Sequence, residues 1–206
     1  MKNIKVVAFD CDGVMFDTIN TNKAYYNYIL NHFGRPEMTS EQLAHVHMHT
    51  VHEAIRSLFK DQHSIEKASA YCKTLNYFQF LQYMEIEPFL KILLERLKGK
   101  YKTAVATNRT DTMSHILTEY SLDKYFDIVV TALDVKKPKP SPDPLIKILK
   151  HFKIESENLI YIGDSKLDEE ASTAAGVFFA AYKNKDLNAD FHINNLKEIE
   201  QILADN

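Results

Sequence analysis

The sequence is poor in cysteine, has no excess of basic charge and lacks long apolar runs. Its 206 residues include two cysteines, Cys11 and Cys72, which are far apart and in no CxxC spacing. This pattern excludes a disulfide framework and a structural zinc site, and it is typical of a reducing compartment. No stretch approaches the roughly 20 apolar residues that a membrane helix needs, and the apolar start of the chain is too short for a signal peptide. We therefore expect a soluble, cytoplasmic protein.

The charge balance limits the partners. A formal net charge of −3 offers no broad basic field, so nucleic acid is not an expected partner, and neither is a membrane. Apolar residues make up 45% of the chain and charged residues 26%, which is ordinary for a globular protein. A chain of this length can form one full α/β domain and a smaller insertion. We expect a monomer or a homodimer that acts on a small molecule.

Short apolar runs alternate with helical patterns over most of the chain. Ile4–Phe9 is rich in β-branched residues and ends in an acid, which is typical of a buried parallel strand. Further runs of this kind are Thr103–Ala106, Asp127–Thr131, Leu159–Ile162, Val177–Ala181 and the short Phe191–Asn194. The helical patterns among them are Asp111–Tyr120, Pro142–Phe152, Leu167–Ala175 and Leu196–Leu203, with Pro142 suited to a helix start and Gly176 to a helix end. The alternation predicts an α/β fold, a Rossmann-like parallel sheet with helices on both faces.

Residues 18–86 break this alternation. They contain no convincing strand, but helical patterns cover Thr18–Phe33, Ser40–Val46, Val51–Phe59 and Ser64–Tyr83. Thr39 with Gln42, and Thr50 with Glu53, have the spacing of capping boxes and are expected to begin the second and third helices. We therefore predict an all-helical cap domain at residues 18–86, inserted into a catalytic core made of residues 1–17 and 87–206.

The turn after the first predicted strand carries two acids. In open α/β sheets, sites form beyond the carboxyl ends of strands, which is where Asp10 and Asp12 fall. One carboxylate can attack phosphorus, while the other donates a proton to the leaving oxygen and then activates water. Strand alternation places Cys11 on the opposite side, so we expect it to pack in the core rather than to react. Gly13 allows a sharp turn; a solvated acidic turn is the alternative for this motif alone.

Polar residues also follow later strands of the predicted sheet. Thr107 and Asn108 offer a hydroxyl and an amide to phosphate oxygens, although these residue types at a strand end are commonly turn residues. Lys139 has a proline on each side, and a lysine held in this way can neutralise both the nucleophile and the transferring phosphoryl group. These residues predict a phosphate site at the same edge of the sheet.

The fourth strand ends in a further acidic motif. Asp164 can join Asp10 in holding a hard cation through oxygen, which is the chemistry that Mg²⁺ prefers. Asp168 lies four residues further on, where it either supports the metal ligands or is an acid in the first turn of a helix. The motif predicts a magnesium site shared between two strand ends.

Four ordered motifs thus stand at successive strand ends. They are Asp10-Cys11-Asp12-Gly13-Val14, Thr107-Asn108, Lys139-Pro140, and Gly163-Asp164-Ser165 with Asp168. Together they resemble the motifs of the haloacid dehalogenase-like hydrolase superfamily. The helical insertion resembles the C1 cap of its phosphoglycolate phosphatase-like members, and the resemblance covers nearly the whole chain.

The resemblance implies a role for each motif residue. Asp10 would be the nucleophile, and Asp12 the general acid and base, which also binds the metal through its main-chain carbonyl. Thr107 and Lys139 would bind the phosphate, and Asp164 would bind Mg²⁺. The implied function is a Mg²⁺-dependent phosphatase that hydrolyses a small phosphorylated metabolite through an aspartyl-phosphate intermediate.

Val14 leaves an alternative open, because many phosphatases of this family carry Thr at that position and its sugar-phosphate mutases can carry Val. A phosphosugar mutase of the β-phosphoglucomutase type is therefore the main alternative. Dehalogenation is disfavoured, since Asp12 serves leaving-group protonation and metal binding, which halide loss does not require. A phosphoaccepting receiver-type signalling module is a distant alternative, because the helical insertion has no place in such a module.

Four histidines cluster in the insertion, at His45, His47, His49 and His52. A transition-metal site is one interpretation of this cluster. The capping box at Thr50 instead implies a break between two helices, and the related caps place a substrate-specificity loop in such a break. We therefore expect His47, Met48 and His49 to contact the substrate, with a solvated surface as the remaining alternative.

Overall fold

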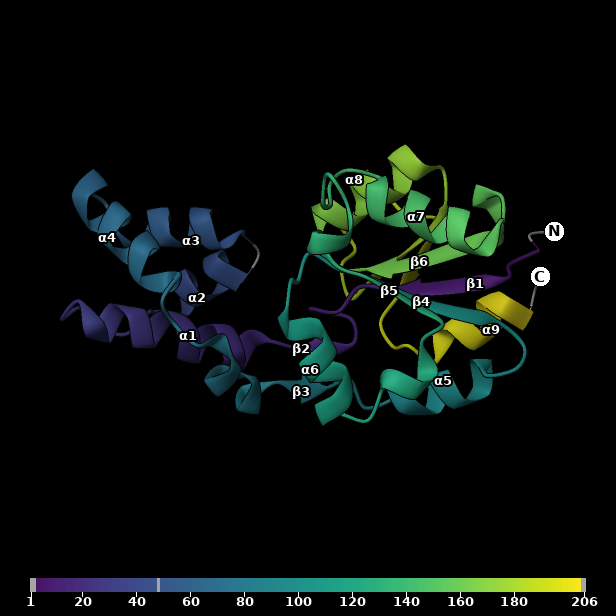
Figure 1. The fold of residues 1–206 in the computed structure, drawn as a ribbon, viewed down its shortest axis with the longest axis horizontal. Helices are drawn as coiled ribbons and strands as arrows, with labels where there is room; N and C mark the ends of the chain where they lie inside the picture. The colour runs from purple at the N-terminus through teal and green to yellow at the C-terminus, as the bar shows by residue number, and fades with distance from the viewer. Residues whose placement is uncertain (1–2, 48, 205–206) are drawn as a thin grey trace. The chain divides into compact units, whose positions relative to one another are not determined.

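The computed structural model describes residues 3–47 and 49–204. The chain divides into two compact units (Figure 1). We call Met1–Phe16 with Ile86–Asn206 the core unit, and Asp17–Glu85 the helical unit. Among the described residues, none of the helices combines the length and the apolar character that a membrane span requires.

The core unit is built on a six-stranded sheet in the order β5-β4-β1-β6-β7-β8. The strands are β1 (Val6–Phe9), β4 (Lys102–Ala106), β5 (Ile128–Val130), β6 (Leu159–Gly163), β7 (Phe178–Tyr182) and β8 (Phe191–Ile193). Every neighbouring pair in this sheet is parallel. All four residues of the central strand β1 are buried, as expected for an apolar strand covered on both faces. The predicted α/β fold with a parallel sheet is confirmed.

Helices cover both faces of this sheet. They are α5 (Leu90–Leu97), α6 (Thr112–Glu119), α7 (Asp143–Phe152), α8 (Lys166–Ala175) and α9 (Glu198–Ala204), with short 3₁₀ helices η2 (Asp123–Tyr125), η3 (Ala132–Asp134) and η4 (Ser156–Asn158). Figure 1 shows α7 and α8 on one face and α5 and α9 on the other. Pro142 directly precedes α7 at its N-cap position, where a helix start was predicted, and Gly176 ends α8 in the left-handed conformation, as predicted. The sequence patterns missed α5, although its four leucines have helical spacing and are all buried.

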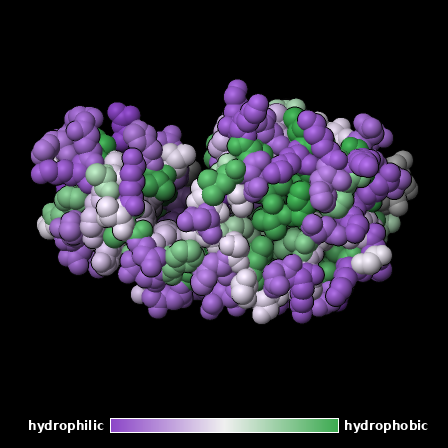
Figure 2. Space-filling model, viewed as in Figure 1, coloured by the Kyte–Doolittle hydropathy of each residue, from purple (hydrophilic) through white to green (hydrophobic). Residues whose placement is uncertain are grey.

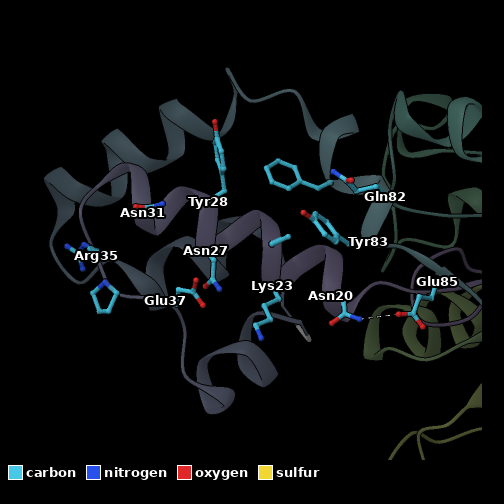
Figure 3. Close-up of a pocket in the computed structure, with 13 residues that line it drawn as sticks. Asn20, Lys23, Asn27, Tyr28, Asn31, Arg35, Glu37, Gln82, Tyr83 and Glu85 are labelled. Atoms are coloured by element: carbon cyan, nitrogen blue, oxygen red, sulfur yellow. Dashed lines mark hydrogen bonds between the residues drawn. The ribbon is translucent and has the colours of Figure 1, made fainter.

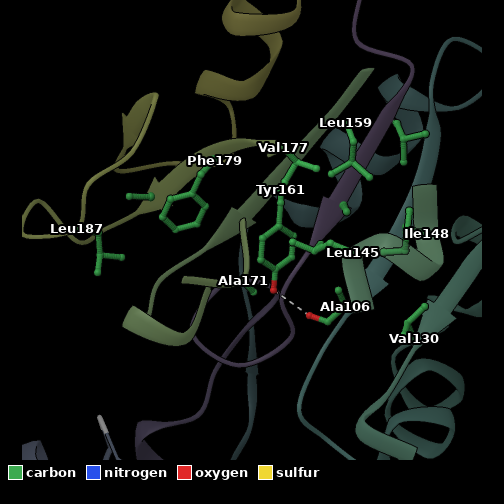
Figure 4. Close-up of a cluster of buried hydrophobic side chains, with 14 residues drawn as sticks. Ala106, Val130, Leu145, Ile148, Leu159, Tyr161, Ala171, Val177, Phe179 and Leu187 are labelled. Carbon is green, nitrogen blue, oxygen red and sulfur yellow. Dashed lines mark hydrogen bonds between the residues drawn. The ribbon is translucent and has the colours of Figure 1, made fainter. Parts of the chain in front are cut away.

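The face of the sheet that packs on α7 and α8 carries a large hydrophobic cluster (Figure 4). Val6, Tyr161 and Phe179 contribute to it from three neighbouring strands, and Leu145 and Ala171 from the two helices. This packing holds the strands in a register in which the last residue of β1 lies beside residues near the carboxyl ends of β4 and β6. The loops that follow these three strands therefore meet at one edge of the sheet.

The helical unit contains α1 (Ile19–His32), α2 (Ser40–His47), α3 (Val51–Leu58), α4 (Gln62–Cys72) and the 3₁₀ helix η1 (Tyr77–Tyr83). The strands β2 (Phe16–Asp17) and β3 (Glu85–Ile86) form a separate two-stranded sheet that the sequence patterns did not reveal, because each has only two residues. The predicted helical stretch Ser64–Tyr83 divides into α4 and η1. The division follows from Asn76, whose side chain accepts a hydrogen bond from the Phe78 N–H at 3.0 Å and starts a new turn.

Both predicted capping boxes are present in the helical unit. The Thr50 and Glu53 side chains each accept a hydrogen bond from the other residue's backbone N–H, and Thr39 and Gln42 make the same reciprocal pair. The unit also has its own hydrophobic cluster, separate from that of the core unit. In the view of Figure 2, hydrophilic residues surround a hydrophobic patch on the core unit.

Candidate active site

The loops after β1, β4 and β6 bring several of the predicted site residues together. Asp10 directly follows β1, Thr107 follows β4 and Asp164 follows β6. Lys139 comes from the loop between η3 and α7, and all of these belong to the core unit. Asp10, Thr107 and Lys139 are buried, whereas the Asp12 side chain is partly exposed.

Lys139 lies at the centre of a charged cluster, which consists of this lysine with Asp10, Asp164 and Asp168. Its Nζ is 2.8 Å from Oδ1 of Asp10 and 2.7 Å from Oδ1 of Asp168, and it donates to the Tyr161 hydroxyl at 2.9 Å. Burial alone would lower the pKa of this lysine, but the two carboxylates outweigh burial and raise it. The ammonium group is therefore a fixed positive charge against Asp10.

Asp10 is the acid most affected by this environment. Its Oδ1 also accepts a hydrogen bond from the Cys11 N–H at 2.7 Å. Burial raises the pKa of Asp10 to about 7, with Lys139 opposing the shift and the neighbouring carboxylates of Asp168 and Asp12 adding to it. A further positive charge beside Asp10 would therefore favour the ionised form that a nucleophile needs.

Asp168 anchors the lysine from the other side. Its Oδ1 also lies 2.8 Å from the Tyr161 hydroxyl, and its Oδ2 accepts from the hydroxyl of Ser165 at 2.6 Å and from the Ser165 N–H at 3.1 Å. Although burial raises the pKa of Asp168, Lys139 and the hydroxyl donors outweigh it, so the net shift is downward. Both oxygens are occupied, which makes Asp168 a support for Lys139 and a cap for α8.

Tyr161 joins this network and was not identified from the sequence. It lies in the middle of β6, and its hydroxyl is 2.9 Å from the Ala106 carbonyl (Figure 4). Burial, and then the nearby carboxylates of Asp168 and Asp10, raise the pKa of Tyr161 well above its usual value. The available signal was a single hydroxyl-bearing residue in the otherwise aliphatic strand Leu159–Gly163.

Two glycines allow the acidic loops to approach one another. A Cβ on Gly13 would lie 2.0 Å from Oδ2 of Asp164, and Gly13 has a φ of +76°. A Cβ on Gly163 would lie 2.4 Å from the Cβ of Asp168. Real Cβ atoms cannot approach other atoms so closely, so these positions require glycine.

The acids form a set that fits a hard divalent cation. One carboxylate oxygen from each of Asp10, Asp164 and Asp168 lies within 4.8 Å of the others. Burial and the charges of Asp10 and Asp168 raise the pKa of Asp164 well above its usual value, and no hydrogen bond reaches its carboxylate from the described residues. Three crowded carboxylates with one lysine have excess negative charge, and oxygen ligands suit Mg²⁺. Since both oxygens of Asp168 are occupied, Asp10 and Asp164 are the side chains free to ligate.

The residues after β4 have different partners. Thr107 is 1% exposed, and its Oγ1 accepts from the Arg109 N–H at 3.2 Å. The Asn108 amide makes two bonds with the Lys139 backbone: Nδ2 donates to the carbonyl at 2.9 Å, and Oδ1 accepts from the N–H at 2.9 Å. Asn108 thus holds the loop that carries Lys139, and its predicted contact with phosphate stays a prediction.

The two residues that follow Asp10 have different surroundings: Asp12 pairs with an arginine, and Cys11 is buried. The Asp12 carboxylate pairs with Arg109, with Nη2 2.6 Å from Oδ1 and Nε 2.9 Å from Oδ2. Arg109 was not identified from the sequence, where it follows Thr107-Asn108 directly. Cys11 is fully buried, and burial raises the pKa of its thiol above the usual value, as expected for a packing residue.

The predicted substrate loop lies in the helical unit. The Nδ1 atom of His47 is 3.0 Å from Nδ2 of Asn22, while His49 stacks on His45 with ring centroids 4.0 Å apart. Met48, the third residue of the predicted loop, lies outside the described residues. Within residues 3–47 and 49–204, these histidines do not form a group of three converging metal ligands.

The helical unit also contains a cavity of about 870 Å³ (Figure 3). Asn20, Lys23 and Asn27 of α1 line it together with Arg35 and with Tyr83 of η1. His47 and His49 are not among the lining residues. The cavity and the predicted substrate loop are therefore separate features of this unit.

Comparisons with known proteins agree with this geometry. A family model described as haloacid dehalogenase-like hydrolase matches residues 7–182. A hydrolase of that superfamily from Geobacter sulfurreducens has a solved structure that is 37% identical, with a TM-score of 0.87 over 98% of this chain and 97% of that one. Two curated relatives are a phosphoglycolate phosphatase from Aquifex aeolicus, 28% identical over 84% of this chain and 82% of its own, and a pyrophosphatase PpaX from Bacillus cereus, 24% identical over 98% and 97%. The chain belongs to the haloacid dehalogenase-like hydrolase family.

Proposed function

We propose that this chain is a Mg²⁺-dependent phosphatase that hydrolyses a small phosphorylated metabolite through an aspartyl-phosphate at Asp10. Membership in the hydrolase family and the phosphatase names of its relatives support an enzyme acting on phosphate esters. The single observation that carries the mechanism is the buried contact between Lys139 and Asp10 inside a group of acids.

Asp10 is placed to act as the nucleophile. Lys139 and the Cys11 N–H both contact its Oδ1, and none of the described residues hydrogen-bonds its Oδ2. One oxygen of the Asp10 carboxylate is therefore proposed to attack phosphorus and the other to face the cation, while the contacts at Oδ1 fix the orientation of the carboxylate. Fixed orientation of this kind lowers the barrier by removing unproductive positions of the nucleophile.

The remaining roles are assigned to the neighbouring residues. Asp10, Asp164 and the main-chain carbonyl of Asp12 would hold Mg²⁺, which neutralises the acids and the phosphoryl oxygens when bound. Asp12 would donate a proton to the leaving oxygen and then accept one from the attacking water. Thr107 and Lys139 would bind the transferring phosphoryl group.

The substrate is proposed to be a small phosphorylated anion like phosphoglycolate. The helical unit would serve as a cap that selects it, with His47, Met48 and His49 as the selecting residues. The phosphosugar mutase alternative rests on Val14, which is fully buried. A cytoplasmic location and a monomeric or dimeric state remain predictions.

A screen of phosphorylated metabolites in Mg²⁺, with phosphate release measured for each, tests this function. We expect release from several small esters and none from the Asp10→Asn variant, because an amide of nearly the same shape is a poor nucleophile. Isomerisation of a sugar phosphate without release of phosphate would identify a mutase. Substantial hydrolysis by the Asp10→Asn variant would exclude the covalent mechanism.

A further inference from the structure

Arg109 binds the carboxylate of Asp12 with both ends of its guanidinium group. Nη2 donates to Oδ1 at 2.6 Å, and Nε donates to Oδ2 at 2.9 Å. Each carboxylate oxygen therefore has its own N–H donor. Paired bonds of this kind fix the direction of a carboxylate as well as its distance.

The arginine is the fixed member of this pair. Its N–H donates to Thr107 Oγ1 at 3.2 Å, and its carbonyl accepts from the Ala132 N–H at 2.9 Å, so the backbone is held between the ends of β4 and β5. The Arg109 side chain is 7% exposed, whereas that of Asp12 is 42% exposed. Without Arg109, the Asp12 side chain would be free to take other rotamers.

Stability alone does not explain this arrangement. In this pair the arginine is buried and the carboxylate is partly open to water, so the attraction between the charges is offset by the desolvation of the arginine and by screening at the carboxylate, and the net contribution to the free energy of folding is small. The pair instead controls where one carboxylate lies, two residues after Asp10 and next to Gly13. That carboxylate is the one to which the proposed mechanism assigns both proton transfers.

We propose that Arg109 is a positioning residue that holds the Asp12 carboxyl group in place for proton transfer. The inference rests on the proposed function. In the first step, Asp12 carries a proton on one oxygen while Arg109 still holds the other. The bond from phosphorus to the leaving oxygen breaks as Asp10 bonds to phosphorus, and the Asp12 proton goes to the leaving oxygen. In the second step, water attacks the phosphorus, the bond to Asp10 breaks, and Asp12 takes a proton from the water. A displaced Asp12 slows proton transfer without changing how the substrate binds.

The test compares two phosphate esters in the Arg109→Gln variant with Mg²⁺ present. An alkyl phosphate needs a proton on its leaving oxygen, whereas p-nitrophenolate leaves without one. For the alkyl ester we expect kcat/KM to fall ~100-fold, the cost of a misplaced catalytic group, while kcat/KM for p-nitrophenyl phosphate stays nearly unchanged. For p-nitrophenyl phosphate, kcat and KM should fall by the same factor, which leaves kcat/KM unchanged. The reason is that hydrolysis of the aspartyl-phosphate, which also needs Asp12, then limits turnover. Arg109→Lys should give an intermediate loss.

Arg96→Gln is the matched control. Arg96 also pairs with a carboxylate of the core unit, Glu200, at 2.6 Å, but neither belongs to the charged cluster, so both esters should react as in the wild type. Equal losses of kcat/KM for both esters in Arg109→Gln would overturn the inference, as would a rise in KM for both. If Arg109→Gln fails to fold by circular dichroism, the same comparison is made with Arg109→Lys.

Measurements on the wild-type enzyme distinguish a failure of the proposed phosphatase function from a failure of the proposed role of Arg109. If it hydrolyses none of the esters, the proposed function fails, and the inference fails with it. If it hydrolyses them and the Arg109 variants react normally, only the inference fails.

Discussion

Nζ of Lys139 and Oδ1 of Asp10 lie 2.8 Å apart, with side chains that are 3% and 9% exposed. The contact is made at a point where Asp168 and Asp164 add negative charge. One buried lysine thus keeps several acids together, and its removal leaves them without a counter-charge. Stability and activity therefore depend on the same contact.

Replacing Lys139 with methionine tests this dependence. Breaking a buried ion pair leaves an uncompensated charge, so the free energy of unfolding should fall by ~3 kcal/mol. Loss of a cation at the phosphoryl group should lower kcat ~100-fold. Urea unfolding and phosphate release measure the two effects, and Lys136→Met, at an exposed lysine in the same loop, should change neither. A Lys139→Met enzyme with normal kcat would remove Lys139 from the reaction.

The raised pKa of Asp10 predicts how the metal-free protein responds to pH. A group with a pKa of 3.8 when unfolded and about 7 when folded binds a proton more tightly in the native state. Its contribution to stability is therefore complete below pH ~4 and is lost as the pH rises through ~7. With chelator present, urea unfolding should show stability falling between pH 5 and 7 by as much as ~1.4 kcal/mol per pH unit for such a group.

Two controls isolate the cause of that slope. The Asp10→Asn variant cannot ionise at this position, so its slope should be smaller. Saturating Mg²⁺ should also reduce the slope, because the cation stabilises the ionised carboxylates. A metal-free slope that is the same in the variant and the wild type would show that other groups cause it.

The strands and their terminal residues could be predicted from the sequence because both signals are local. Short β-branched runs identify buried strands, and Asp10, Thr107 and Asp164 follow such runs directly. Tyr161 and Arg109 could not be found in this way. The role of Tyr161 depends on α8 bringing Asp168 back to the sheet, and that of Arg109 depends on the neighbouring strand end, so both are products of tertiary packing.

The helical unit shows a different limit. Its capping boxes are local patterns and were predicted with their residues. The division of the stretch after Ser64 depends on one side chain, Asn76, which accepts a bond two residues ahead. A helix pattern of apolar spacing contains no information about that bond.

Metal binding can be measured without turnover in the Asp164→Ala variant. Mg²⁺ should raise the Tm of the wild type in a concentration-dependent manner, because it binds the folded state only. The variant lacks one of the two free carboxylates, so the Tm shift should be largely lost. Asp123→Ala, an exposed acid of the core unit, should keep the full shift. A full shift in Asp164→Ala would place the ion elsewhere.

Comparing Gly13→Ala with Gly99→Ala distinguishes the cost of backbone strain from the cost of crowding against Asp164. Gly13 and Gly99 have nearly the same φ, +76° and +77°, but only at Gly13 would a Cβ meet another residue within 4 Å. Gly99→Ala should therefore lose ~1 kcal/mol from strain alone, and Gly13→Ala should lose more. Only Gly13→Ala should also weaken the Mg²⁺-dependent Tm shift, because its Cβ would displace Asp164. Equal effects of the two variants would show that the contact with Asp164 is unimportant.

The substrate loop is tested by replacing His47, Met48 and His49 together with alanine. The ring of His47 is positioned by Asn22 at 3.0 Å, and that of His49 contacts the His45 carbonyl through Nδ1 at 2.7 Å. Both rings can donate hydrogen bonds to an anionic leaving group. If these contacts select the substrate, their loss should change kcat/KM for preferred metabolites by ~10–200-fold relative to poor ones.

A minimal ester distinguishes loss of selection from general damage in this triple variant. p-Nitrophenyl phosphate needs few contacts beyond the phosphoryl group, so its kcat/KM should change little. His63→Ala, an exposed histidine of the same unit, should leave the ranking of metabolites as it is in the wild type. If the triple variant ranks the metabolites as the wild type does, the selecting residues lie elsewhere in the helical unit, and the cavity lined by Lys23 and Arg35 becomes the next place to substitute.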